Sequence, residues 1–130
     1  MGKINGVFET EQHVIGSLLF GNNDFSTETL VVEAAGAGEE INIVDGTVLV
    51  RDETTQKLKV AEDTDGALFV LCNEVATPIT AAGEYPVRVV KSGRVDRRKV
   101  FLNGTAVTDA QVDALRNYGI LAEDAYSVNG

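Results

Sequence analysis

The sequence predicts a mainly β domain with one short α-helix (α+β), built as a small β-sandwich or barrel with an extended N-terminal arm. From residue 29 onward, short β-branched runs alternate with turn residues at close spacing, which is typical of small all-β domains. One later segment carries both the start and the stop signals of a helix. A chain of 130 residues is long enough to bury a core as one domain without disulfides.

The strand-forming runs are short, and turn-forming residues follow them. Asp45-Gly46 and Asn103-Gly104 are turn signals, because glycine and asparagine tolerate left-handed backbone conformations. Ser92-Gly93 is expected to separate two strands. Pro78 and Pro86 are expected to bracket a loop, because proline removes a ladder donor. The expected strands are residues 29–33, 41–44, 47–51, 57–60, 67–72, 87–91, 94–95 and 100–102.

A single helix is expected near residues 109–118. Thr108 and Gln111 have the spacing of a capping box, in which each side chain bonds the backbone N–H of the other residue. Gly119 can adopt the left-handed conformation that closes a helix. The apolar residues of this helix share one face, so we expect it to cover one hydrophobic surface.

Residues 1–27 contain many apolar residues together with glycines such as Gly21 and the turn-like Asn22-Asn23-Asp24, and they show no clean helical period. Such a segment is too apolar for an ordinary disordered tail. We therefore interpret residues 1–27 as an arm and residues 28–130 as the β-rich domain. The arm either packs onto its own domain or meets a partner surface or a neighbouring subunit. Its candidate contact residues are Val7, Phe8, Val14, Ile15, Leu18, Leu19 and Phe20.

Charge is distributed unevenly along the chain. The net charge of −9 argues against general nucleic-acid binding, which depends on neutralising phosphates. Six of the eleven basic residues nevertheless fall within residues 88–99. This cluster is interpreted either as a solvated strand and turn or as a docking patch for an acidic protein surface. The candidates for electrostatic docking are Arg94, Arg97 and Arg98.

Composition also bears on location and redox chemistry. No apolar run approaches the roughly 20 residues that span a bilayer, and the N-terminus lacks the order of a secretion signal. We therefore expect a soluble chain, made in a cytoplasm and without a membrane partner. Cys72 is the only cysteine and lies in an apolar run with no basic residue next to it in sequence, so we interpret it as a buried structural thiol.

The residues needed for the usual catalytic and metal sites are missing. His13 is the only histidine and lies in the arm, so a nucleophile in the domain has no imidazole base. One cysteine and one histidine cannot complete a usual zinc site. Residues 63–66 resemble a calcium loop superficially, but aligning Gly66 with its glycine puts Ala61 and Cys72 where carboxylates are required. We expect no enzyme, no cofactor and no metal.

The order of several short motifs resembles that of the head decoration proteins of tailed bacteriophages, the lambda-like group. The resemblance covers roughly residues 28–121, and each motif alone is common. The motifs are, in order, Gly46-Thr47-Val48-Leu49, the Asp65-Gly66 turn, Asn73-Glu74-Val75, Tyr85-Pro86-Val87-Arg88-Val89, Ser92-Gly93-Arg94-Val95 and the helix ending in Gly119-Ile120. The arm is longer and more apolar than in short members of this group, and the basic stretch of residues 94–99 is denser.

The resemblance implies a non-enzymatic homotrimer on the outer surface of the expanded phage head, made in the host cytoplasm. It would sit at three-fold or quasi-three-fold positions and hold neighbouring major capsid subunits together against internal DNA pressure. It also implies attachment partly through the N-terminal segment by strand pairing with capsid elements. The seven apolar arm residues would face the capsid, and Arg94, Arg97 and Arg98 would pair with acidic groups on the capsid or on an adjacent protomer.

Two other functions remain to be compared with this one. The first is a β-rich adhesion or carbohydrate-binding module displayed on a virion surface. Sugar sites usually contain exposed aromatic residues, and this chain has no tryptophan and only Tyr85, Tyr118 and Tyr126 as tyrosines. The second is a trimeric β-enzyme, which the missing catalytic residues disfavour.

Overall fold

The structure is a computed structural model that describes residues 18–72 and 78–123. It confirms the predicted fold class: the chain is mainly β with one short helix, and five strands form a closed barrel. The strands are β2 (Leu19–Val32), β3 (Val48–Arg51), β4 (Leu58–Val60), β5 (Leu68–Leu71), β6 (Gly83–Asp96), β7 (Phe101–Leu102), β8 (Thr105–Ala106) and β9 (Ile120–Glu123). A 3-10 turn, η1 (Arg97–Lys99), and the helix α2 (Asp109–Arg116) complete the described elements.

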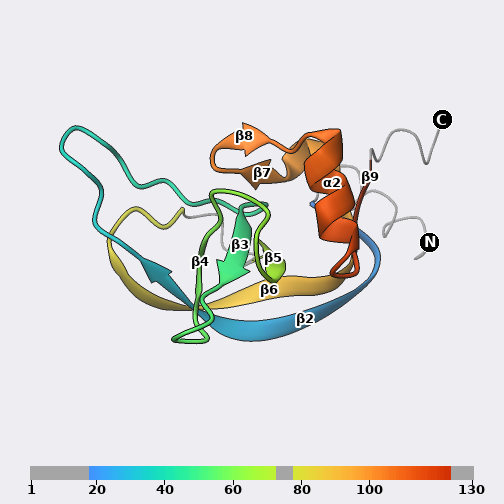
Figure 1. Ribbon diagram of the computed structural model, residues 1–130, viewed down its shortest axis with the longest axis horizontal. Helices are drawn as coiled ribbons and strands as arrows, with labels where there is room; N and C mark the ends of the chain where they lie inside the picture. The colour runs from blue at the N-terminus through green and yellow to red at the C-terminus, as the bar shows by residue number, and fades with distance from the viewer. Residues whose placement is uncertain (1–17, 73–77, 124–130) are drawn as a thin grey trace, which may run out of the picture.

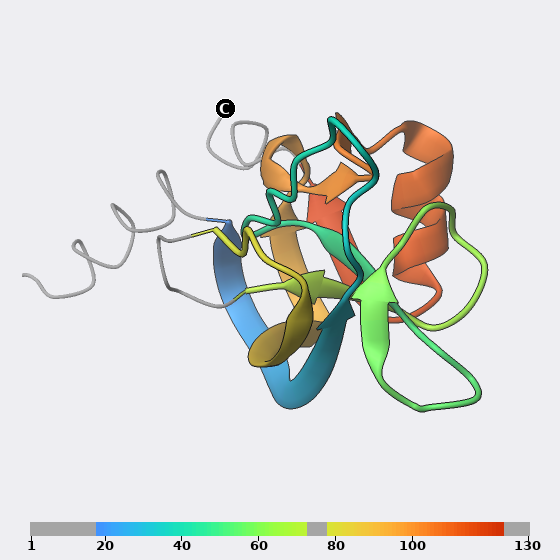
Figure 2. The same cartoon turned by 90° about the vertical axis from the view of Figure 1, so that its left-hand side faces the viewer.

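The two longest strands form a curved ribbon around which the barrel closes (Figure 1). The barrel order is β2-β4-β3-β5-β6, and β6 then pairs with β2. The antiparallel register of β2 and β6 runs from Leu19 opposite Val95 to Val32 opposite Gly83. Seen from the side, the strands surround a common interior (Figure 2). Beyond the barrel, β9 pairs in parallel with the C-terminal part of β6.

One hydrophobic cluster fills the barrel. It takes residues from all five barrel strands, as expected when alternate side chains of each strand point inward. An ion pair lies at one end of this interior: Arg51 contacts Glu28 at 3.1 Å, and its guanidinium lies 4.9 Å from the centre of the Phe69 ring. The fully or nearly fully buried members are Leu30, Leu49, Leu58, Leu71, Val87 and Val89.

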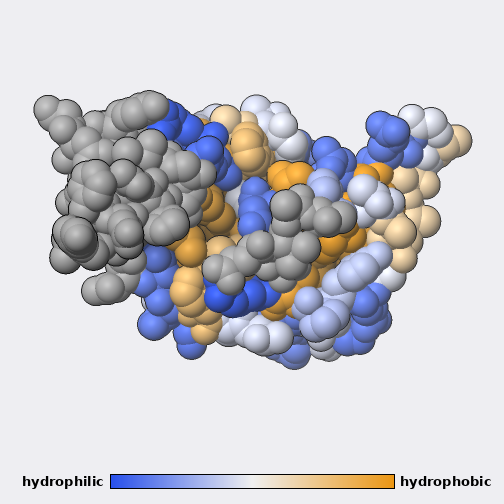
Figure 3. Space-filling model, turned by 180° about the vertical axis from the view of Figure 1, so that it is seen from behind, coloured by the Kyte–Doolittle hydropathy of each residue, from blue (hydrophilic) through white to orange (hydrophobic). Residues whose placement is uncertain are grey.

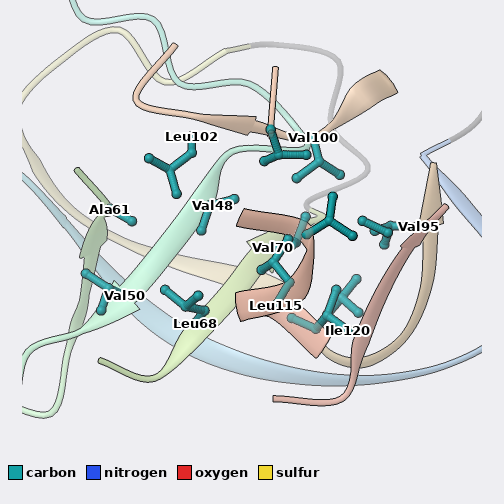
Figure 4. Packing of buried hydrophobic residues seen from close by; sticks show 14 of the residues in the cluster. Val48, Val50, Ala61, Leu68, Val70, Val95, Val100, Leu102, Leu115 and Ile120 are labelled. Atoms are coloured by element: carbon teal, nitrogen blue, oxygen red, sulfur yellow. The ribbon is translucent and has the colours of Figure 1, made fainter. Parts of the chain in front are cut away.

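A second, larger cluster lies on the other face of β3, β5 and β6, where the C-terminal elements cover it. Figure 4 shows Leu115 and Ile120 beside Val70, with Leu102 on the side of Val48. The helix contributes only Val112 and Leu115 as buried residues, so it covers one hydrophobic surface, as the sequence predicts. Cys72 is buried in the same cluster, which confirms its interpretation as a buried thiol.

The predicted capping box of α2 is present. The Thr108 hydroxyl accepts a hydrogen bond from the Gln111 N–H at 3.3 Å, and the Gln111 side chain accepts one from the Thr108 N–H at 2.9 Å. Gly119 has a φ of +84°, as expected for the end of the helix. The helix ends at Arg116, earlier than expected, because the N–H groups of the next three residues bond carbonyls three positions back and tighten the chain into a 3-10 turn.

Some strand boundaries differ from the prediction. Residues 83–96 form one strand, although Ser92-Gly93 was expected to divide it, and Pro86 lies within it rather than at the edge of a loop. The register shift opposite Ser92 and Gly93 is an irregularity in a continuous ribbon, not a turn. Within residues 18–72 and 78–123, Pro86 pairs only with Thr29 of β2, and proline tolerates a strand position with a partner on one side. Of residues 41–44, only Ile43 pairs, through an isolated bridge to Ile79.

The predicted boundary between arm and domain falls inside a strand. Residues 19–27 belong to β2 and pair with β6, so the barrel begins at Leu19 and not at residue 28. Sequence patterns missed this extension because glycine and asparagine at residues 21–23 read as a turn, whereas the structure absorbs them in a shift of register. The rest of the predicted arm, residues 1–17, lies outside the described residues.

Candidate functional site

The structure brings members of the two predicted groups of binding residues, Leu19 and Phe20 from one and Arg94 from the other, to one end of the barrel. Phe20 of β2 lies opposite Arg94 of β6, and Leu19 lies opposite Val95, although about seventy positions of sequence separate them. On the other side of β6, Arg94 lies opposite Leu121 of β9. We call this region, residues 18–20, 94–98 and 121–123, the terminal end. Leu18 and Glu123, the first and last described residues, therefore lie at the same end of the barrel.

The seven apolar candidates are divided between the barrel and the undescribed segment. Leu18 and Leu19 are half-buried and pack against the larger hydrophobic cluster, so they contribute to the core of their own domain. Phe20 lies in β2, where its backbone pairs with Arg94. The remaining candidates, Val7, Phe8, Val14 and Ile15, lie outside the described residues. Their role in capsid binding stays a prediction.

The first part of β2 has a pairing partner on one side only, among the residues that the structure describes. Its partner is β6, and β4 joins the other side of β2 only at Leu30. A strand with an unpaired side presents backbone donors and acceptors that another strand can use. The register shifts in this part are held by the Asn23 side-chain amide, which donates to the Arg94 carbonyl at 2.9 Å, and by Ser92, which donates to Asp24 at 3.2 Å.

The three candidate arginines are not equivalent. Arg94 is exposed on β6. Arg97 pairs with Asp109 at 2.9 Å and also donates to the Val107 carbonyl at 3.3 Å, which ties η1 to the start of α2. Arg98 pairs with Asp96 at 3.0 Å. Two of the three guanidinium groups therefore already have acidic partners within this domain, and Arg94 is the best candidate for contact with another molecule.

Asp96 is a residue of this end that the sequence reading missed. It is the only charged residue that is fully buried in the described part of the chain, with 0% exposure. Burial acts to raise its pKa, but hydrogen bonds from Arg98 outweigh this effect and hold the pKa below the usual value. The available signal was local: Asp96 precedes η1 and caps it by accepting the Arg98 N–H. Its neighbours Leu18 and Glu123 are distant in sequence, so its burial was not visible there.

A second unforeseen contact fixes the first part of β2 to the barrel. The guanidinium of Arg88 lies 4.2 Å from the centre of the Phe25 ring. The same group donates to the Cys72 carbonyl at 3.3 Å and lies 3.7 Å from the Cys72 sulfur. No basic residue adjoins Cys72 in sequence, yet the pairing of β5 with β6 places one beside it. This arrangement gives Arg88 a structural role within the basic cluster.

Away from the terminal end, an open groove of about 1120 Å³ is lined by loops and strand ends. Its charged lining is mainly acidic: eight carboxylates face it, against Arg51 and Lys59. In the described ranges, no group of three potential metal-ligating side chains is close enough to hold an ion. An acidic groove repels phosphate backbones, which agrees with the charge argument against nucleic-acid binding.

The two described tyrosines do not form a sugar-stacking pair. Tyr85 is half-buried and donates to the Ala81 carbonyl at 2.7 Å, whereas Tyr118 is 43% exposed. Tyr85 lies in the first part of β6, and Tyr118 precedes Gly119, whose carbonyl bonds Gly93 in the last part of that strand. Eight residues of strand correspond to roughly 26 Å, so the two rings do not act together. Tyr126 lies outside the described residues.

Hydrophobic side chains also reach the molecular surface away from the terminal end. Figure 3 shows hydrophobic areas between hydrophilic ones on one face. Among the residues that pack against the barrel interior, Ile41, Ile79 and Tyr85 are only partly buried.

No helix of the described chain is long and apolar enough to cross a membrane.

The chain matches no protein-family model, and no curated protein matches it.

Proposed function

We propose that this chain is a capsid decoration protein of a bacteriophage head. It binds the outside of the expanded head as a homotrimer at three-fold or quasi-three-fold sites and stabilises the shell against the pressure of packaged DNA. Its partners are the major capsid protein and two further copies of itself. The motif order that resembles the lambda-like decoration proteins is the basis of this proposal, which involves no catalytic step.

One structural observation supports the proposal most directly. The apolar N-terminal segment and the basic stretch are candidate contact residues on separate grounds, and one member of each, Phe20 and Arg94, pair with each other. A single end of the barrel can then offer apolar contacts, strand pairing and positive charge to one partner. An exposed strand side of β2 adjoins the same end in the described chain.

Attachment by three such ends allows each contact to be weak. Ordering an N-terminal segment on a partner costs conformational entropy, which main-chain hydrogen bonds and a few apolar anchors offset. Once one protomer of a trimer has docked, the other two bind at high effective concentration. The net charge of −9 disfavours binding to the packaged DNA, which agrees with a position on the outer surface of the head.

The direct test is to mix the protein with expanded capsids that lack it and to image the particles by electron microscopy. We expect added density at the three-fold or quasi-three-fold positions. Absence of bound protein at saturating concentration would exclude the proposed function.

A truncation separates the contribution of the N-terminal segment from that of the fold. Deleting residues 2–17 leaves β2 complete, since the strand begins at Leu19. We expect the shortened protein to keep its thermal transition and to lose at least about tenfold in capsid affinity, because each docked segment contributes to avidity. Wild-type occupancy of the truncated protein would show that the segment is not the attachment element.

A further inference from the structure

Asp96 combines complete burial with a formal charge, and in the described chain the hydrogen bonds to its carboxylate all come from Arg98. Its Oδ1 atom accepts from the Arg98 backbone N–H at 3.0 Å and from Arg98 Nε at 3.2 Å, and its Oδ2 atom accepts from Arg98 Nη2 at 3.0 Å. The Asp96 side chain has 0% exposure, whereas that of Arg98 has 41%. The buried carboxylate is therefore paired with a guanidinium that is itself partly exposed.

The backbone of Asp96 joins three segments at the terminal end. Its N–H donates to the carbonyl of Leu18, the first described residue, at 2.8 Å. In β9, Glu123 lies opposite Asp96. Asp96 also ends β6 and caps η1. A movement of Asp96 would displace Leu18, the end of β9 and η1 together.

An apolar residue would fill this buried position without the desolvation cost of a carboxylate. Buried ion pairs are often no more stabilising than well-packed apolar residues, but they define one arrangement of the chain because an unpaired buried charge is strongly disfavoured. Here the defined arrangement is the turn from β6 into η1, which orients the Asp96 N–H toward Leu18. The charge therefore selects a geometry at the place where Asp96 meets Leu18.

We propose that Asp96, held by Arg98, is a positioning residue that fixes Leu18 at the start of the barrel. The consequence for docking rests on the proposed function, whereas the positioning itself is a property of the free protein. Correct positioning matters for a docking strand, because backbone pairing with a partner requires a fixed register and direction.

Hydrogen exchange in the free protein tests the positioning without any capsid. The Asp96 amide reports the bond to Leu18, and the Leu71 amide, which donates to Thr47 at 2.9 Å in the barrel, serves as the reference. In Arg98→Ala, we expect the ratio of the Asp96 to the Leu71 exchange rate to rise about tenfold, the loss expected when hydrogen bonds to a charged group are removed. A ratio unchanged from wild type would overturn the proposal, because the ion pair would then support the fold only in general.

Two further variants sharpen this measurement. Arg98→Lys keeps the positive charge without the two-pronged geometry, so we expect a ratio between those of wild type and Arg98→Ala. Arg116→Ala removes an exposed arginine whose pair with Asp113 is 3.5 Å long, so its ratio should equal that of wild type. A rise as large in Arg116→Ala as in Arg98→Ala would contradict a specific role of the buried pair.

The docking consequence is measured on expanded capsids that lack the protein. We expect Arg98→Ala to bind them about tenfold more weakly than wild type, with Arg98→Lys between the two. Equal binding of all variants, alongside normal binding of wild type, would overturn the docking consequence. If wild type does not bind, the proposed function is rejected instead. The exchange ratio in the free protein would still decide whether Asp96 positions Leu18.

Discussion

Gly46 lies directly against the backbone carbonyl of Lys99, so close that a Cβ atom at residue 46 would collide with that oxygen. Its φ of +94° is also in the left-handed region that favours glycine. Gly46 donates its N–H to the Leu71 carbonyl at 2.8 Å and accepts from the Phe101 N–H at 2.9 Å. This glycine therefore joins β5 of the barrel to the segment that follows η1.

Replacing Gly46 by alanine should destabilise the protein strongly. A left-handed conformation costs a residue with a Cβ about 1–2 kcal/mol, and displacing a packed backbone adds about 1–3 kcal/mol. We expect a loss of about 3 kcal/mol in the free energy of unfolding, measured by chemical denaturation. Gly104→Ala is the matched control, because Gly104 has a φ of +82° but no atom within 4 Å of the added methyl group. An equal loss in both variants would show that the contact with Lys99 has no effect.

The capping box gives a smaller and more local prediction. Thr108→Ala removes the acceptor for the Gln111 N–H and should lower the free energy of unfolding by about 1 kcal/mol. Thr108→Ser keeps a hydroxyl in the same place and should lose much less. Thermal denaturation of both variants measures the difference. A Thr108→Ser protein as unstable as Thr108→Ala would point to the lost methyl group and not to the cap.

The helix start and the turn at Asn103-Gly104 show which parts of the structure could be predicted from the sequence. The helix start was predicted to the residue because Thr108 and Gln111 interact with their own neighbours in sequence. The glycine-containing turn at Asn103-Gly104 was predicted for the same reason, and both residues have positive φ angles. Local chemistry decides such features, whatever the rest of the chain does.

The long ribbon was not predictable in the same way. Residues 21–23 and 92–93 read as turns, but pairing of β2 with β6 over most of their length outweighs local preference and keeps both strands continuous. The candidate site depends on this pairing, since it places Phe20 opposite Arg94. Asp96 likewise meets Leu18 and Glu123, and no local pattern around residue 96 reveals these neighbours.

The buried ion pair should respond unequally to loss of its two members. Arg98→Ala leaves the Asp96 carboxylate buried without its partner, a change that typically costs about 3 kcal/mol or more. In Asp96→Asn the buried charge disappears, and the 41% exposed Arg98 side chain can be hydrated. We therefore expect Asp96→Asn to lose clearly less stability than Arg98→Ala in urea denaturation. The opposite order would contradict the burial of the carboxylate as the dominant effect.

The same carboxylate makes stability depend on acid pH. Despite the opposing effect of burial, the bonds from Arg98 hold the pKa of Asp96 below its usual value, so the folded state favours the ionised form. This contribution is present above the unfolded pKa of about 3.9 and is lost as the pH falls through the lower, folded pKa. Below about pH 4, the free energy of unfolding should therefore fall more steeply for wild type than for Asp96→Asn.

The Asp52 carboxylate also makes the free energy of unfolding fall at acid pH, and it does so equally in wild type and in Asp96→Asn. Hydrogen bonds from the backbone N–H groups of Thr55 and Thr54 lower the pKa of Asp52. Because wild type and Asp96→Asn share Asp52, its effect cancels in their difference. Urea denaturation at several pH values down to about pH 2.5 measures the difference directly. A difference that stays constant with pH would show that Asp96 does not titrate as proposed.

Reversing the charge of Arg94 tests the electrostatic part of the proposed capsid contact. Arg94 is exposed, and unlike Arg97 and Arg98 it has no acidic partner in the described part of its domain, so Arg94→Glu should leave the thermal transition nearly unchanged. We expect capsid affinity to fall about tenfold at low salt, because an attraction to acidic groups becomes a repulsion. The affinity should also weaken less with added salt than that of wild type, since an attractive term has been removed.

Lys59→Glu provides the matched control for that reversal. It makes the same change in net charge on β4, which joins β2 at Leu30, far from the terminal end. Capsid occupancy of wild type and both variants, measured over a range of salt concentrations, separates a local contact from a general charge effect. Equal losses for the two variants would assign the effect to net charge. An Arg94→Glu protein with the salt profile of wild type would remove Arg94 from the docking surface and leave attachment to the N-terminal segment alone.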